Sequence, residues 1–398
     1  MNICFISSSF ARNEKDICAP WILRLAQELI ARGWQVSVFV SSHKGLRQTE
    51  CCGAKIFRFR YSLKAWERLT HEDRSPALLH KFSQRLLLLS YMVCGSVSAL
   101  FFFAGKKFDV IDVHWPFPQA VFGIIGKWLT GARLTYYFYA SEILLVEKSP
   151  ALKRFCAWLM TFADEIVTIS NPSKDLLIRN FGTGYDIKVI PFGTTMPAAA
   201  PSPSRPPAAG APLKLMYAGK LIERKGVIYL IRALKLLKDR GVDARLKLVG
   251  SGYLKDELKA AVTELGIENE VDFAGFLPSQ SKELSDAYAG CDIFILPSII
   301  DSRGDTEGLG YVVLDAMSHG KPVIASAVGG ITDMIKDGET GFLVPEKDPA
   351  ALAEKIIFVR DNYPAAQKIA AAGWDFALNN FSWENAVKGL SAAYKGDR

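Results

Sequence analysis

Short apolar runs alternate with helical patterns in two series, one on each side of a proline-rich segment. In the first series, the strand candidates are residues 3–6, 36–40, 55–59, 110–113, 134–138, 166–169 and 188–190. In the second, they are residues 213–218, 246–249, 271–273, 293–296 and 323–325. Strands that alternate with helices form parallel sheets with covered faces. The sequence therefore predicts an α/β protein with two Rossmann-like parallel-sheet domains.

The segment between the two series, residues 197–212, contains six prolines in sixteen residues. Proline cannot continue a helix or a central strand, so this segment reads as a linker. We expect an N-terminal domain over residues 1–196 and a second domain from residue 213. Two such domains suggest a cleft at their joint, because ligands of open α/β sheets bind beyond the carboxyl ends of the strands.

Positive charge is concentrated in the first part of the chain. Residues 1–110 hold sixteen Lys and Arg against eight Asp and Glu, an excess of +8, so the remaining residues sum to −1 of the total +7. Arg58, Arg60, Lys64 and Arg68 lie among aromatic residues. Such a patch suits an anionic membrane surface or an anionic acceptor, or is an ordinary solvated face. We find no nucleic-acid-binding module and expect no nucleic-acid partner.

The seven cysteines are odd in number, and the adjacent pair Cys51-Cys52 does not make a disulfide framework. Reduced thiols are typical of a cytoplasmic protein. No Cys-x-x-Cys is present, so a zinc site has no support. The N-terminus reads as a first strand and lacks the features of a signal peptide.

Residues 86–105 carry no charge and are mostly apolar, with Arg85 before them and Lys106-Lys107 after. Twenty such residues are long enough to span a bilayer. Ser90, Gly95 and other small or polar residues interrupt the run. We expect a helix that is buried or faces a membrane, which would make the protein peripheral on the inner face of a membrane.

Residues 306–317 combine two carboxylates with a glycine-bracketed turn. Glu307 precedes Gly308, Leu309 and Gly310, and Asp315 follows Glu307 by eight residues. If a helix begins in this turn, its free N–H groups and the positive end of its dipole suit a phosphate. The two carboxylates could then bind hydroxyl groups of a nucleotide sugar. The alternative is a loop followed by a core helix with incidental acids.

A second candidate anion site follows the first strand of the second domain. Residues 219–226 place Lys220, Arg224 and Lys225 in a strand-to-helix loop between two glycines. Cations there can neutralise a diphosphate, and the glycines allow close approach of the backbone. The alternative is a basic surface loop.

Three further strand ends in this domain carry candidate donor-binding residues. Gly250 belongs to a Gly-x-Gly turn, which is weak evidence and lacks the six-residue dinucleotide fingerprint. That absence argues against a nicotinamide dehydrogenase. Phe276 could form one wall of a base pocket, although aromatic residues at strand ends are usually core. Ser298 opens the polar loop that leads to Glu307, and loops of this kind commonly carry function.

The first domain contributes three candidates for the acceptor side. His114 ends one strand, and Tyr139 and Glu142 follow the next, so we expect them to face the cleft. A structural role for His114 is an equal alternative. No Asp-x-Asp is present, so a metal ion held by carboxylates on the donor phosphates has no support, and we expect no metal or other cofactor.

With these residues assembled, the chain resembles the retaining glycosyltransferases of family 4, the group 1 transferases, which have the GT-B fold. Glu307 and Asp315 match the family's Glu-x7-Glu signature, with aspartate in the second position. The Gly-Arg-Leu-x-x-x-Lys-Gly signature is matched at Gly219, Lys220, Leu221, Lys225 and Gly226, with lysine in place of arginine. Residues 329–331, 337–345 and 381–384 also resemble the corresponding sequences of the family.

The resemblance implies a role for each matched residue. Glu307 would bind the donor sugar and stabilise the oxocarbenium ion, and the amides of residues 308–310 would hold the sugar and distal phosphate. Lys220 and Lys225 would stabilise the departing diphosphate, and Asp315 would hold the ribose. The second domain would end near residue 372, and a last helix in residues 373–398 would return to the first domain.

The implied function is retaining transfer of a sugar from a nucleoside-diphosphate sugar to a glycan or lipid-linked acceptor. The sequence Gly-Asp-Thr-Glu-Gly, which contains Glu307, is similar to that of family members that build bacterial polysaccharide. Many members have histidine where Tyr139 stands, so either His114 substitutes for it or no protein base is needed. The departures at Lys220, Asp315 and Tyr139 leave two alternatives open, a sugar-nucleotide-binding protein that does not transfer and a GT-B-like nucleotide-sugar epimerase.

Overall fold

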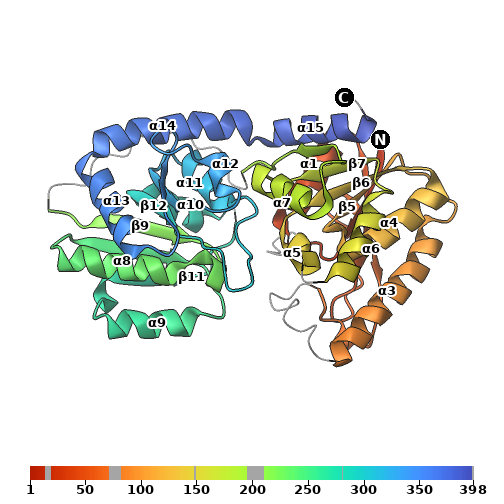
Figure 1. Cartoon of the computed structure of the whole chain (residues 1–398), viewed down its shortest axis with the longest axis horizontal. Coiled ribbons are helices and arrows are strands. Elements are labelled where there is room, and N and C mark those ends of the chain that lie inside the picture. Colours follow the sequence, from red (N-terminus) through yellow and green to blue (C-terminus); the bar gives the residue numbers. More distant parts are fainter. Residues whose placement is uncertain (14–18, 71–81, 148, 195–209, 280, 397–398) are drawn as a thin grey trace. The chain divides into compact units, whose positions relative to one another are not determined.

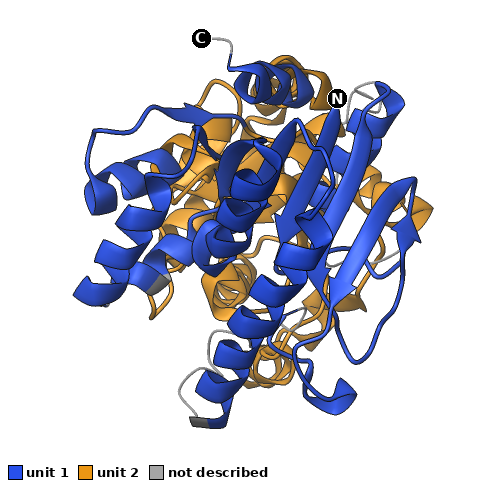
Figure 2. Ribbon diagram, turned by 90° about the vertical axis from the view of Figure 1, so that its right-hand side faces the viewer, with its two compact units in different colours: residues 1–169, 173–190, 386–398 blue, residues 170–172, 191–385 orange. Residues whose placement is uncertain are grey.

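The chain forms two compact units in a computed structural model that describes residues 1–13, 19–70, 82–147, 149–194, 210–279 and 281–396. Unit 1 comprises residues 1–169, 173–190 and 386–398, and unit 2 comprises residues 170–172 and 191–385 (Figure 2). The chain therefore passes between the units at residues 169/170, 172/173, 190/191 and 385/386, whereas the sequence predicted divisions at 196/197 and 372/373. Residues 197–209 of the expected linker lie outside the described residues.

Unit 1 contains an eight-stranded sheet in the order β3-β4-β2-β1-β5-β6-β7-β8. Its strands are β1 (Asn2–Ser7), β2 (Gln35–Ser41), β3 (Glu50–Cys51), β4 (Ala54–Phe59), β5 (Val110–His114), β6 (Arg133–Phe138), β7 (Glu165–Thr168) and β8 (Ile187–Val189). All neighbouring strands pair in parallel except the edge strand β3, which runs antiparallel to β4. This two-residue strand is too short to give a sequence signal.

Helices connect the strands of unit 1 and pack around its sheet (Figure 1). They are α1 (Pro20–Ala31), η1 (Lys64–Trp66), α3 (Phe82–Phe103), α4 (Pro116–Thr130), α5 (Ser141–Glu147), α6 (Pro150–Met160) and α7 (Asn171–Phe181), the last of which begins within unit 2. Proline at the first turn suits a helix start, because that N–H has no partner in the helix. α6 shows this, with Pro150 at its start and the Ser149 hydroxyl accepting from the Leu152 N–H.

Unit 2 contains a six-stranded sheet in the order β11-β10-β9-β12-β13-β14, and every pairing is parallel. Its strands are β9 (Leu213–Ala218), β10 (Ala244–Val249), β11 (Val271–Gly275), β12 (Ile293–Leu296), β13 (Val323–Ser326) and β14 (Phe342–Val344). β12 and β13 are completely buried, as expected for central strands covered by helices on both faces.

The helices of unit 2 up to α12 lie in the crossover connections between these strands, and α13 and α14 follow the last strand (Figure 1). They are η2 (Glu223–Lys225), α8 (Val227–Asp239), α9 (Lys255–Glu264), η3 (Glu268–Glu270), α10 (Lys282–Gly290), α11 (Tyr311–Ser318), α12 (Ile331–Met334), α13 (Pro349–Asp361) and α14 (Tyr363–Asn380). The predicted class of two parallel-sheet α/β domains is thus confirmed.

The last helix, α15 (Trp383–Lys395), begins in unit 2, and its residues from Ala386 onward belong to unit 1. Tyr394 anchors it to the sheet of unit 1, because its hydroxyl donates a 2.5 Å hydrogen bond to Oδ2 of Asp112 in β5. Both side chains are completely or almost completely buried.

Candidate active site

Glu307 lies at the centre of a buried charged cluster in unit 2. Its Oε1 is 2.6 Å from Nζ of Lys225 and 3.3 Å from Nη1 of Arg224. The same oxygen accepts a 3.2 Å hydrogen bond from the Ser298 hydroxyl. The carboxylate thus has two cations and a hydroxyl group around it, which is the pairing that a buried charge requires.

Backbone geometry brings the two cations to this carboxylate. Arg224 and Lys225 belong to the single 3-10 turn η2, which ends at Gly226 with a left-handed φ of 61°. A Cβ at Gly226 would collide with the carbonyl oxygen of Pro297, at the end of β12. Glycine at this position therefore lets the loop after β9 approach the loop after β12, from which Glu307 comes.

Charge pairing fixes the ionisation state of Glu307. Burial alone would raise the pKa of Glu307, but the ammonium of Lys225 and the guanidinium of Arg224 outweigh it and lower that pKa to about 2. The carboxylate also raises the pKa of Arg224. Glu307 is therefore an anion at neutral pH and cannot serve there as a proton donor.

The glycine-bracketed turn leads into α11 as the sequence indicated. Gly310 has a φ of 96° and precedes the first residue of α11. The N–H of Gly330 donates a 3.0 Å hydrogen bond to the carbonyl oxygen of Glu307. A Cβ at Gly330 would meet the Gly308 carbonyl, so this segment lies directly against the turn. Leu309 is buried.

Asp315 lies in α11 and is almost completely buried. Its Oδ1 accepts a 2.7 Å hydrogen bond from the hydroxyl of Thr194. Thr194 carries no sequence signal of function, because a lone threonine beside the proline-rich segment looks like any other loop residue. Only the fold brings it to a residue 121 positions away.

The remaining donor-side candidates lie in loops that follow the parallel strands. Lys220 is exposed after β9, and Phe276 is exposed after β11. Gly250 follows β10 with a φ of 138°, and a Cβ there would collide with the Gly219 carbonyl. Since carboxyl ends of parallel strands meet at one edge of a sheet, these loops and Glu307 share that edge.

Charges of both signs gather at this edge. The loop after β9 carries the cations Lys220, Arg224 and Lys225, and the loop after β12 carries Asp301, Asp305 and Glu307. Nε of Arg224 is 3.7 Å from Asp305, so the guanidinium bridges Asp305 and Glu307. The sequence indicated Arg224 only as one of three cations in the loop after β9. Residue spacing does not reveal its contact with Glu307.

The three acceptor-side candidates form a cluster in unit 1. Nδ1 of His114 is 2.9 Å from the hydroxyl of Tyr139, and the Tyr139 N–H donates a 2.7 Å hydrogen bond to Glu142. His114 is completely buried, and burial lowers its pKa to about 3. The imidazole is therefore neutral at physiological pH and has no contact with solvent.

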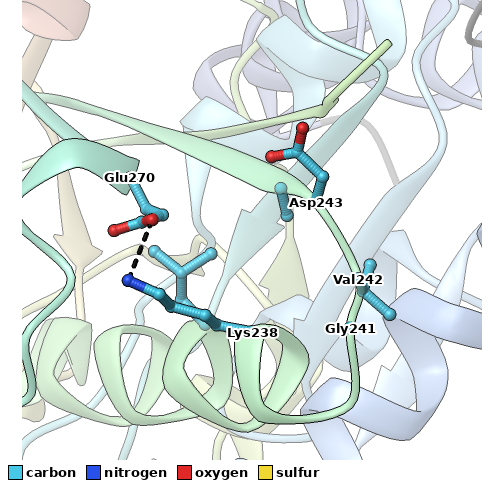
Figure 3. A pocket seen from close by; sticks show the side chains of 7 residues that line it. Lys238, Gly241, Val242, Asp243 and Glu270 are labelled. Carbon is cyan, nitrogen blue, oxygen red and sulfur yellow. Dashed lines mark ion pairs between the residues drawn. The ribbon is translucent and has the colours of Figure 1, made fainter. Parts of the chain in front are cut away.

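A separate hollow of about 230 Å³ lies in unit 2 (Figure 3). It is lined by Lys238, residues 241–244 and Glu270, and Nζ of Lys238 is 3.0 Å from Glu270. Because β10 begins at Ala244, this hollow lies at the amino ends of the strands. It is therefore at the opposite edge of the sheet from Glu307 and is not part of the candidate site.

Two family models match consecutive parts of the chain. The model for glycosyltransferase family 4 matches residues 20–195, and the model for group 1 glycosyl transferases matches residues 203–374. The chain belongs to the group 1 glycosyltransferases of family 4. The second match contains Glu307, Asp315 and the three loop cations of this group 1 glycosyltransferase.

Named relatives agree with this membership. WcaL of Escherichia coli (strain K12), provisionally assigned to colanic acid biosynthesis, is 33% identical over 43% of the chain and 41% of its own length. The chain thus matches less than half of this relative. A GDP-mannose-dependent phosphatidylinositol monomannoside mannosyltransferase of Mycolicibacterium smegmatis is 28% identical over 71% of the chain and 75% of its own length.

Solved structures confirm the GT-B fold of this group 1 glycosyltransferase. Sucrose-phosphate synthase from Thermosynechococcus elongatus has a TM-score of 0.76 at 19% identity, covering 99% of this chain and 98% of that one. HepE from Anabaena, solved in complex with UDP, has a TM-score of 0.73 at 20% identity and full coverage of both chains. At this identity the similarity concerns the fold alone.

Proposed function

We propose that the protein is a retaining glycosyltransferase that moves a hexose from a nucleoside-diphosphate sugar to a glycan or lipid-linked acceptor. The observation that carries this proposal is the buried Glu307 carboxylate, paired with Lys225 and Arg224 and followed directly by the turn that opens α11. Carboxylate, cations and helix N-terminus are the three elements that a sugar diphosphate requires.

In this proposal, the diphosphate binds the cations at the strand ends. The bond between the anomeric carbon and the diphosphate oxygen breaks, and the electron pair leaves with the diphosphate. Lys220, Lys225 and Arg224 stabilise the charge that develops on it, with the amides of residues 308–310. The acceptor hydroxyl oxygen bonds to the anomeric carbon on the face that the diphosphate leaves, and its proton passes to the departing diphosphate. No metal ion is required, because these cations neutralise the leaving group.

Carboxylates hold the sugar and the nucleoside in this arrangement. Glu307 binds donor sugar hydroxyls and stabilises the oxocarbenium ion, and its pKa of about 2 keeps it negatively charged for that role. Asp315 accepts hydrogen bonds from the ribose hydroxyls. Gly250, Phe276 and Ser298 contribute to the donor side. Tyr139 lies on the acceptor side, positioned by His114 and Glu142.

The named relatives support a role in cell-surface polysaccharide biosynthesis. WcaL is assigned to colanic acid, AmsK of Erwinia amylovora to amylovoran biosynthesis, and the mycobacterial relative uses GDP-mannose. HepE was solved with UDP-glucose as well as with UDP. A cytoplasmic enzyme at the inner face of a membrane would meet both nucleotide sugars and lipid-linked acceptors.

The decisive experiment combines a donor screen with two variants. Nucleoside diphosphates and their sugars are tested for the rise in melting temperature that binding to the native state produces. With the donor so identified, Glu307→Gln and Lys225→Ala should each lower kcat by about a hundredfold or more. Glu257→Gln, an exposed change on α9, is the matched control. The anomeric configuration of the product, read by NMR, tests retention, and activity in a chelator tests metal independence.

Two outcomes would replace the proposal. Binding of a nucleoside diphosphate without transfer across an acceptor panel would indicate a sugar-nucleotide-binding protein. Formation of an epimer from the nucleotide sugar without acceptor would indicate an epimerase. Near-normal turnover in either variant would refute the roles given to Glu307 and Lys225.

A further inference from the structure

The helix α3 carries an apolar face that nothing in the described part of unit 1 covers. By length and composition, residues 83–103 could cross a membrane. Only 28% of the most apolar part of this segment is buried in the structure, so most of it is available to a partner. We define the α3 stripe as the side chains that are 47% to 79% exposed: Leu86, Leu89, Val93, Val97, Leu100 and Phe101. The first five are spaced by three or four residues, and Phe101 follows Val97 by four, which places all six on one side of a helix.

The opposite side of α3 belongs to the core of unit 1. Tyr91 and Phe103 are buried, and the Tyr91 hydroxyl forms a 3.3 Å hydrogen bond with the side-chain amide of Gln119. Gly95 lies so close to Phe122 of α4 that a Cβ there would overlap its ring. Crossing a bilayer would separate these contacts, so α3 is fixed to the unit and only its stripe is available.

Positive charge stands at both ends of the stripe. Arg85 precedes it, and Lys106 and Lys107 follow it, all exposed. The stripe and its flanks, residues 83–108, contain no aspartate or glutamate. On the helix, the Ser90 hydroxyl donates a 2.6 Å hydrogen bond to the Tyr61 carbonyl, and the segment that follows Tyr61 exposes Leu63, just before η1, and Trp66 within it.

These observations distinguish a lipid surface from a second copy of the chain. Two stripes packed in antiparallel fashion would place Arg85 of one chain near Lys106 and Lys107 of the other. Parallel packing would place each of these cations near the same residue of the second copy. Both arrangements oppose like charges. An anionic bilayer instead accepts the apolar side chains below its headgroups and attracts the flanking cations.

We propose that the α3 stripe docks on an anionic lipid surface, with α3 lying in the plane of the interface. This inference deepens the lipid-linked alternative for the acceptor, but it depends on no residue of the donor site. Its test uses no donor or acceptor, so its failure would leave the proposed sugar transfer unaffected. Failure of the proposed sugar transfer would likewise leave the docking proposal unaffected.

The test uses the full-length protein and vesicles. Binding is measured by co-flotation with vesicles of equal parts phosphatidylcholine and phosphatidylglycerol, and with vesicles of phosphatidylcholine alone. We expect binding to the anionic vesicles that weakens at high salt. Leu89→Gln combined with Val93→Gln should weaken it by at least about tenfold, because two side chains lose their apolar burial.

Matched variants separate docking from a loss of folding. Phe358→Gln, a similarly exposed aromatic change on α13 of unit 2, should leave vesicle binding unchanged. Melting temperatures should agree among the variants, since the replaced side chains are exposed. In addition, Phe101→Trp should show a blue-shifted fluorescence on adding anionic vesicles, and Phe358→Trp should not.

Four outcomes would overturn the proposal. The first is no binding to anionic vesicles at low salt. The second is binding that the double variant leaves intact, which would place the contact elsewhere. The third is concentration-dependent dimerisation that the double variant abolishes, without vesicle binding, which would assign the stripe to a second copy. The fourth is membrane association that survives alkaline carbonate, which would indicate a span.

Discussion

The hydroxyl of Thr194 donates a 2.7 Å hydrogen bond to Oδ1 of Asp315, the residue proposed to hold the ribose of the donor. This bond fixes the orientation of the carboxylate that is proposed to accept the ribose hydroxyls. Thr194 borders the proline-rich segment, and Asp315 lies in α11. The contact therefore connects the start of that segment to the proposed nucleoside site.

We expect Asp315→Asn to weaken nucleoside diphosphate binding by at least about tenfold, because hydrogen bonds to a charged acceptor contribute about 1.5–3 kcal/mol. Thr194→Val should weaken it only a few-fold, since the charge remains and only its orientation is lost. Calorimetric titration with the diphosphate found in the donor screen measures both. Tighter binding in Thr194→Val would contradict this prediction, because it would mean that Thr194 competes with the ribose.

Arg224 provides a prediction that the sequence did not make. Arg224→Ala should lower kcat by about a hundredfold, because it removes one of the charges proposed to stabilise the leaving group. Arg224→Lys should recover part of the loss, since an ammonium keeps the charge but not the fork of donors that reaches Asp305 and Glu307. Arg245→Ala, an exposed change on β10, is the control. Full activity of Arg224→Ala would exclude the residue from the site.

The close approach of the loops after β9 and β10 predicts a stability effect. Gly250→Ala should lower the free energy of unfolding of unit 2 by about 3 kcal/mol or more, because the new methyl group would overlap the Gly219 carbonyl at a left-handed φ. Gly290→Ala has open space and should be neutral or slightly stabilising. Thermal unfolding of both variants checks this, and equal melting temperatures would disprove the close packing.

Asp112 predicts a pH-dependent attachment of α15. Burial raises the pKa of this carboxyl from 3.8 to about 7. The folded protein keeps this proton over a range where the unfolded chain has released it, so this group makes the folded state less stable as the pH rises from about 4 to about 7. Asp112→Asn resembles the neutral form and should remove that dependence.

Hydrogen exchange of the amides in residues 386–395, corrected for the intrinsic effect of pH, measures this attachment. Wild-type protection should fall as the pH rises through this range, and protection in Asp112→Asn should stay constant. Asp175→Asn, an exposed change on α7, should behave like the wild type. A wild-type protein whose α15 is equally protected throughout the range would contradict the prediction.

The sequence determined the class of fold and most of the residues of the candidate site. Alternating apolar runs predicted the strands, because strands of a parallel sheet are buried on both faces and need continuous apolar residues. The motif around Glu307 predicted a turn and helix, and Gly310 indeed adopts a positive φ before α11. These features depend on neighbours within a few residues, which is what a linear pattern records.

Contacts between distant segments could be decided only by the tertiary structure. Three contacts depend on which loops the sheets bring together: Arg224 with Glu307, Thr194 with Asp315, and His114 with Tyr139. The same holds for α3, whose apolar residues look alike in the sequence. Packing against α4 buries one side of α3 and leaves the other exposed, because a neighbouring helix can contact only one side of it.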